Sequence, residues 1–252
     1  MLFRRALFVP LRSRPSRFHG PVLLLLAGVV PLVALSLTAC GITVTSTSNQ
    51  AKAGTASSGS TRAGSVDSGA GPHRTVSDLL ALPTSEESHA TDYDRDSFGR
   101  RWADIDGNGC GQRDDVLARD LTNVRTKEGA CTVLSGRLVD PWTGTEVAFT
   151  KTEPAKVQID HVVALAEAWR SGAWAWTDVQ RERYANDLSV LVATEGKVNR
   201  DKSDKDAATW SPVGASRACV YARHVVDLKT VFGLSVDRAE RTALRRHLES
   251  CD

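Results

Sequence analysis

The sequence predicts an α+β fold in one folded unit that spans residues 74–252. All six tryptophans and all three tyrosines follow residue 90, so the large aromatic side chains that a core needs lie in this part of the chain. Short β-rich runs and amphipathic helical runs occur there without the regular strand–helix alternation that builds a parallel sheet. With 41% hydrophobic and 25% charged residues, the composition is that of an ordinary globular protein.

Caps, turn residues and apolar spacing predict the individual elements. Pro83 ends the first helix, because proline cannot continue one. The sequence P-W-T-G at 141–144 predicts a hairpin turn between two β-rich runs, and Gly233 separates the last two helices. In chain order we expect helices at 77–82 and 114–121, strands at 131–140, 145–150 and 156–159, a helix at 161–170, a helix from Thr177 to about 186, a strand at 188–193, and helices at 216–232 and 235–248.

Residues 1–40 predict an export signal. Five arginines and no acidic residue lie in this segment, and residues 21–39 carry no charge. The run ends in L-T-A-C-G, so it resembles a bacterial lipoprotein signal in which Cys40 is lipidated. A plain signal anchor is the alternative, because nineteen such residues can span a bilayer. Either way we expect an extracytoplasmic protein, held at the cell membrane by a lipid anchor or secreted.

Residues 41–73 predict a disordered tether. They are mostly Ser, Thr, Gly and Ala and include no aromatic residue, so they cannot bury enough apolar surface to fold. The formal net charge of +2 reflects the arginines of the signal: beyond residue 40 there are 27 basic and 30 acidic residues, a net of −3. Such a unit has no overall attraction for nucleic acid, so phosphate binding would need a local cationic patch or a metal ion.

Four cysteines remain when Cys40 is set aside. No C-x-x-C pair is present, so a structural zinc site is not expected. An even number of cysteines in an exported domain predicts two disulfides. Three connectivities are possible, and we expect the neighbours in sequence to pair, Cys110 with Cys131 and Cys219 with Cys251.

Ordered sequence blocks in the second half of the chain resemble the HNH endonucleases. Asp160 and His161 follow a predicted strand, and a block N-R-D-K-S-D-K-D begins 38 residues later at Asn199, before W-S-P at 210–212. This pattern is similar to an exported bacterial group with a D-H-V core and an N-R-x-K-x-D…W-x-P tail.

Three upstream blocks extend the resemblance to the first part of that group. They are Y-D-R-D-x-F-G-R-x-W from Tyr93, D-x-D-G-N-G-C from Asp104 and D-V-L-A-R-D-L from Asp115. The resemblance therefore covers roughly residue 93 to the C-terminus. It implies a ββα-metal core of the HNH type with added helices and two disulfides.

The same residue types suit the hydrolysis of a phosphodiester, which needs a base for water, a cation at the phosphate and donors for its oxygens. His161 titrates near neutral pH and is the expected catalytic base. Asp160 and Asn199 offer the hard oxygen atoms that Mg²⁺ or Mn²⁺ prefers. The cations expected to contact phosphate are Arg200, Lys202 and Lys205.

Three further residues are expected to support this site. HNH proteins usually carry an Asn in the strand between the two ligand-bearing elements. In this sequence that position falls near Val190, so Asn186, just before the predicted strand, is expected to take the role of that Asn. Arg119 is expected along the phosphate path with Arg95, Arg100, Arg101 and Arg113, and a surface ion pair is the alternative for each. Glu167 lies on the predicted helix after His161, either close to the site or on a solvated face.

A second metal site is predicted around Asp104. Asp104, Asp106 and Asn108 place side-chain oxygens at positions 1, 3 and 5 of a loop that resembles the first half of a Ca²⁺ loop, and Asp115 stands at position 12. The alternative is an Asx-rich turn that anchors Cys110. The sequence therefore predicts either a structural Ca²⁺ ion or a self-contained turn.

These observations lead to a first hypothesis of an exported, lipid-anchored, metal-dependent endonuclease that cuts nucleic acid, DNA more than RNA, with little sequence preference. The second hypothesis is a non-catalytic surface lipoprotein that binds nucleic acid or a protein partner. In that case Asp160 and His161 would be a structural pair, and residues 199–206 a solvated charged turn. A third is a Ca²⁺-stabilised structural domain. Replacement of His161 by Ala separates the first two.

Overall fold

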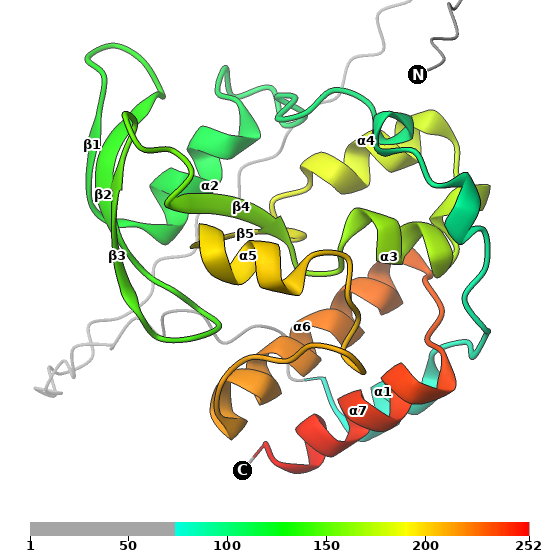
Figure 1. The fold of residues 1–252 in the computed structure, drawn as a ribbon. Helices are drawn as coiled ribbons and strands as arrows, with labels where there is room; N and C mark the ends of the chain where they lie inside the picture. Colours follow the sequence, from blue (N-terminus) through cyan, green and yellow to red (C-terminus); the bar gives the residue numbers. More distant parts are fainter. Residues whose placement is uncertain (1–73, 252) are drawn as a thin grey trace, which may run out of the picture. The chain divides into compact units, whose positions relative to one another are not determined.

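The computed structural model describes residues 74–251, so the signal, the lipidation of Cys40 and the tether lie outside the described residues. Figure 1 shows the path of the chain. The elements in order are α1 Val76–Ala81, η1 Ala90–Asp92, η2 Arg95–Phe98, α2 Gln112–Asp120, β1 Thr122–Thr126, β2 Val133–Val139, β3 Glu146–Thr150, β4 Val157–His161, α3 Leu165–Arg170, η3 Ala173–Ala175, α4 Asp178–Asn186, β5 Leu191–Glu195, α5 Gly196–Lys202, α6 Ala215–Phe232 and α7 Arg238–Glu249.

The first sheet has three antiparallel strands in the order β1-β2-β3. Its predicted hairpin joins β2 to β3, and the buried carboxylate of Asp140 closes the turn by accepting the backbone N–H groups of Trp142 and Thr143. The other oxygen of Asp140 accepts the Thr194 hydroxyl and the Glu195 N–H, each at 2.6 Å. One carboxylate therefore ties the hairpin to β5.

The second sheet is the antiparallel pair β4–β5, which is placed at the junction of two hydrophobic cores. Val157 and Ile159 of β4 belong to a core formed with α2 and the three-stranded sheet. Val162 and Val163, directly after β4, belong to the other core, which is formed mainly by helices. In Figure 1 these helices and the three-stranded sheet lie at opposite ends of the described part, with β4 and β5 between them.

Both expected disulfides are present. Cys110 is bonded to Cys131, and Cys219 of α6 is bonded to Cys251, which follows α7. Each disulfide therefore links two of these four cysteines that follow one another along the chain. Within residues 74–251 no helix is long and apolar enough to cross a membrane.

The mixed α+β class is confirmed, with differences at three elements. The helix expected at 161–170 begins only at Leu165, because the backbone of His161 is still paired with Leu191 as a strand, and Ala164 has an extended conformation. Strand β1 was not predicted. The short helix α5, which carries Asn199, was not predicted as an element either.

Candidate functional site

A cleft of about 530 Å³ opens beside the end of β4. It brings together four segments of the chain: the segment around η2, the start of α2, strand β4 with the start of α3, and the end of α5 with the residues after it. Asp160, His161 and Asn199 all line it. The other lining residues include Tyr93, Arg95, Arg101, Trp102, Arg113, Gln158, Ser203 and Asp204.

Helix α5 is fixed on β4 by two side-chain pairs in matching register. Asn199 Nδ2 donates to Gln158 Oε1 at 2.8 Å, and Lys202 Nζ donates to Asp160 Oδ1 at 2.9 Å. Residues two apart on a strand face the same side, and residues three apart on a helix do as well. The N-x-x-K spacing of α5 therefore fits the Q-x-D spacing of β4.

Asp160 lies in a buried ion pair. Its exposed fraction is 4%, that of Lys202 is 0%, and Lys202 Nζ also donates to the carbonyl of His161 at 2.8 Å. Burial raises the pKa of Asp160, while Lys202 and the indole of Trp142 oppose that rise. The second carboxylate oxygen, Oδ2, is buried and has no hydrogen-bond partner among residues 74–251.

The ring of His161 is held in one tautomer. Its Nε2 lies 2.9 Å from the carbonyl oxygen of Ala185 at the end of α4. A carbonyl only accepts hydrogen bonds, so Nε2 carries the proton and Nδ1 keeps its lone pair. Within the described part of the chain Nδ1 has no hydrogen-bond partner. Burial lowers the pKa of His161 to about 3; the bond to the Ala185 carbonyl opposes this, and Arg95 and Lys202 lower the pKa further. The expectation that His161 titrates near neutral pH is therefore wrong, and the ring is neutral at ordinary pH.

Three arginines supply the positive charge of the cleft. Arg95 and Arg101 form no ion pair with any residue in the range 74–251, and Arg113 donates to the backbone carbonyls of Pro154 and Val157. Burial lowers the pKa values of Arg95 and Arg113. Arg95 and Arg113 are half-buried, whereas Arg101 is exposed. Half-buried guanidinium groups without a carboxylate partner favour an anionic ligand.

The structure places the three predicted phosphate contacts elsewhere. The expectation for Lys202 is wrong, because its amine is fully buried against Asp160 and His161. Arg200 is exposed beside a separate hollow that Trp142 and Trp210 line. Lys205 is exposed and donates to the backbone carbonyl of Asp201 at 2.7 Å.

Asn186 and Arg119 both anchor backbone. Asn186 is fully buried; its Oδ1 accepts the N–H of Ala103 at 2.9 Å, and its Nδ2 donates to the carbonyl of Arg100 at 3.0 Å. It therefore fixes the segment on either side of Trp102. Arg119 donates to the carbonyls of Leu188 and Leu191, each at 2.6 Å, so it holds the start of β5 and does not line the cleft.

Glu167 is neither in the cleft nor on a solvated face. It is 2% exposed and accepts bonds from Lys229 Nζ at 2.7 Å and from Ser171 Oγ at 2.5 Å. Lys229 also donates to Glu240 Oε2 at 2.5 Å, so one buried ammonium group contacts two buried carboxyl groups. Helix α3 is amphipathic, but its polar side faces α6 and α7, and this long-range packing could not be seen locally.

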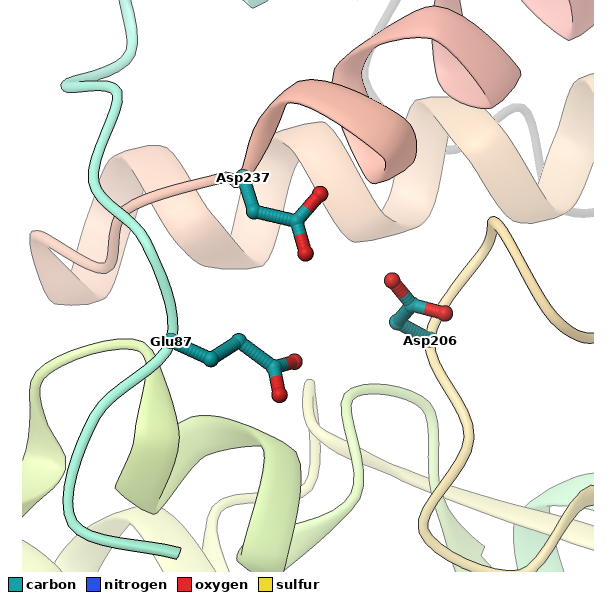
Figure 2. A group of neighbouring side chains, drawn as sticks. All are labelled: Glu87, Asp206 and Asp237. Carbon is teal, nitrogen blue, oxygen red and sulfur yellow. The ribbon is translucent and has the colours of Figure 1, made fainter.

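Beside this cluster, three further carboxylates face one another (Figure 2). Glu87, Asp206 and Asp237 come from the extended segment after α1, the loop after α5 and the start of α7, and one oxygen of each lies within 4.8 Å of the others. Burial and the neighbouring Glu167 raise the pKa of Glu87 to about 7. Negative charge is therefore concentrated where these three segments meet.

In the loop around Asp104 the hydrogen bonds follow the turn alternative. The Asp104 carboxylate accepts the N–H groups of Gly107, Asn108 and Gly109, and Asn108 Oδ1 accepts the N–H of Cys110. The loop thus closes on itself and leads into the first disulfide. A Ca²⁺ ion at Asp104, Asp106 and Asn108 stays a prediction.

Sequence reasoning missed some residues of the cleft. Gln158 had a usable signal, because it stands two residues before Asp160 and so shares its face of the strand. Trp102 is the last residue of the block that begins at Tyr93, but that block does not show its place beside His161, which depends on a contact across 59 positions in the chain.

The family model for "GmrSD restriction endonucleases, C-terminal domain" matches residues 111–246, more than half of the chain. The chain belongs to this family. The matched range includes β4, β5 and α5, and with them Asp160, His161 and Asn199. The nuclease-related family that the motifs indicated is therefore confirmed.

A relative of this GmrSD-family chain is an "Uncharacterized secreted protein" of Arthroderma benhamiae. The two sequences are 42% identical over 175 residues, which is 69% of this chain and 82% of the relative. The similarity thus extends well beyond the residues that the family model matches.

Proposed function

We propose that this protein is an exported, metal-dependent endonuclease of the HNH type that hydrolyses the phosphodiester bonds of nucleic acid, DNA in preference to RNA. The observation that carries the proposal is the meeting of Asp160, His161 and Asn199 in one cleft with three arginines. The antiparallel pair β4–β5 followed directly by α5 supports a ββα-metal core. The name of the family favours DNA.

The residues of the cleft fit a divalent ion. Asp160 Oδ2 is a buried oxygen that forms no hydrogen bond in the described range, although the Trp142 indole also stabilises the charged form of this carboxylate. The amide nitrogen of Asn199 is bonded to Gln158, which leaves its amide oxygen for another partner. Carboxylate and amide oxygens are ligands that Mg²⁺ and Mn²⁺ prefer. Bound between these two residues, such an ion would supply Lewis-acid stabilisation of the negative charge that develops on the phosphate and the leaving oxygen.

His161 is proposed as the general base. Its Nδ1 accepts a proton from the water molecule whose oxygen attacks phosphorus, while Nε2 keeps its proton and its bond to Ala185. The P–O bond to the leaving sugar oxygen then breaks. The Ala185 carbonyl fixes the ring and stabilises its charged form, and this offsets part of the cost of burying a charged imidazole.

Arg95, Arg101 and Arg113 are proposed to bind the phosphate oxygens in place of Arg200, Lys202 and Lys205. Planar guanidinium groups bind phosphate with two donors, and a half-buried one loses less solvation when the anion arrives. Export is supported by the two disulfides and by the relative that is described as secreted. Lipidation of Cys40 and the membrane anchor remain part of the proposal.

The test uses the full chain in detergent with both disulfides formed, and supercoiled plasmid or RNA as substrate. We expect nicking with Mg²⁺ or Mn²⁺ that EDTA stops and that His161→Ala lowers by at least 100-fold, consistent with the usual contribution of a general base. His224→Ala is the matched control, because His224 also bonds a backbone carbonyl, that of Ser189 at 2.7 Å, but lies outside the cleft. Equal activity of His161→Ala and wild type would refute the role of His161. No cleavage by folded protein with any divalent ion would favour a binding protein instead.

A further inference from the structure

The segment that contains Trp102 has a strained backbone. Trp102 has a φ of 56°, in the left-handed region that side chains other than glycine rarely occupy. Such a conformation is strained and persists only where the surroundings fix it. Strained residues of this kind cluster at functional sites, and Trp102 lines the cleft.

Helix α4 fixes this segment from both sides. Asn186 bonds the carbonyl of Arg100, two residues before Trp102, and the N–H of Ala103, directly after it. The N–H of Arg100 also donates to Glu182 Oε1 at 3.2 Å. Three hydrogen bonds from two residues of α4 thus hold Arg100 and Ala103, the two ends of the four-residue segment that contains Trp102, and offset the strain there.

The same end of α4 holds the ring of His161. Ala185, which precedes Asn186, accepts the bond from His161 Nε2. The indole of Trp102 lies nearly parallel to the imidazole, with the planes 17° apart and the ring centroids 6.5 Å apart. One turn of α4 therefore sets both the hydrogen-bond partner of the imidazole and the aromatic side chain beside its face.

We propose that Trp102 is a positioning residue that keeps the imidazole of His161 in its working orientation, and that Asn186 holds Trp102 in place for this purpose. The inference rests on the proposed function of His161 as the base. A ring held by one hydrogen bond alone can still swing about that bond, and an aromatic face beside it restricts this rotation. A displacement of about 1 Å at such a group can cost about 100-fold in rate.

The test compares Trp102→Ala, Trp102→Gly and Trp102→Phe in the full chain. Trp174→Ala is the matched control, because Trp174 is also stacked on a histidine, His89 at 4.0 Å, but lies outside the cleft. We expect Trp102→Ala and Trp102→Gly to lower kcat by about 10- to 100-fold with KM changed less than threefold. Trp102→Phe should recover most of the loss, and Trp174→Ala should lose nothing.

Two further measurements do not depend on cleavage. The ring-proton NMR signals of His161, assigned by their absence in His161→Ala, should move in Trp102→Ala and in Trp102→Gly, return part of the way in Trp102→Phe and stay in place in Trp174→Ala. The glycine variant should also unfold at a higher denaturant concentration than the alanine variant, because glycine adopts a φ of 56° without strain. This comparison provides a folded variant without the ring if Trp102→Ala does not fold.

The outcomes separate the two proposals. If wild type cleaves and Trp102→Ala keeps its kcat, or loses only affinity for substrate, the positioning role is refuted while the nuclease stands. If wild type does not cleave, the proposed function fails, and the His161 signals alone decide whether Trp102 orients the ring. Signals that stay in place in Trp102→Ala would overturn the inference in either case.

Discussion

The burial of Lys202 gives the sharpest test of the site. Lys202→Met keeps most of the aliphatic stem but removes the ammonium group that compensates Asp160. Two contacts are lost, at 2.9 Å to Asp160 Oδ1 and at 2.8 Å to the His161 carbonyl. A charge pair at that distance is worth about 6 kcal/mol at an effective dielectric constant of about 20. Part of this energy is offset, because the variant has no ammonium group that must be removed from water on folding. We therefore expect a net loss of about 3–5 kcal/mol in the free energy of unfolding.

The assay is denaturant unfolding of the oxidised protein, with Lys205→Met as the matched control. Lys205 is exposed, so its variant should change stability by less than about 0.5 kcal/mol. Adding Asp160→Asn to Lys202→Met removes the uncompensated charge. The double variant should therefore lose about 1–3 kcal/mol less stability than the sum of the losses in the two single variants. Equal midpoints for Lys202→Met and Lys205→Met, or additive single effects, would refute the buried ion pair.

Two other predictions concern α5 and the helical core. Gly196→Ala should lower stability by about 1–3 kcal/mol, because a Cβ there overlaps the carbonyl oxygen of Ala155. Helix propensity alone predicts the opposite, a gain of about 1 kcal/mol. Lys197→Ala, on the exposed side of the helix, is the control. Burial raises the pKa of Glu240 from 4.5 to about 8, so the native state binds an extra proton between these values. The free energy of unfolding should therefore fall as pH rises from about 5 to 8, by up to about 5 kcal/mol. Glu240→Gln should flatten this profile in denaturant unfolding at a series of pH values, and an unchanged slope would contradict the assignment.

Local patterns predicted most elements of the fold. The hairpin followed from its turn residues, α4 from the cap at Thr177, and the last two helices from their apolar spacing and Gly233. The start of the helix after His161 was wrong because a run such as V-V-A-L-A suits a helix as well as a strand end. Pairing with β5, which lies 30 residues further on, decides between them.

Only part of the candidate site was predicted, because the cleft, like the end of β4, depends on contacts between distant parts of the chain. The residues of β4 and α5 stand in recognisable motifs, and the structure brings Asp160, His161 and Asn199 into one cleft. The cations of the cleft come from segments 48 to 66 positions before His161, and no local pattern shows which arginines face it. Arg95, Arg101 and Arg113 were among five arginines expected along the phosphate path, but the residues assigned to phosphate contact were those nearest to Asn199 in sequence, and the amine of one of these, Lys202, is buried in the interior.

The burial of Lys202 explains why residues 199–206, with their alternating charges, are not a solvated turn. In N-R-D-K-S, the residues at the first and fourth positions face β4, while Arg200 and Asp201 between them face away. One helical turn of this motif therefore has two roles. It places an amide side chain at the cleft, and it supplies the buried ammonium group that opposes the rise of the Asp160 pKa caused by burial. The divalent ion proposed for this site would bind the charged form of Asp160, and Lys202 favours that form from within the fold.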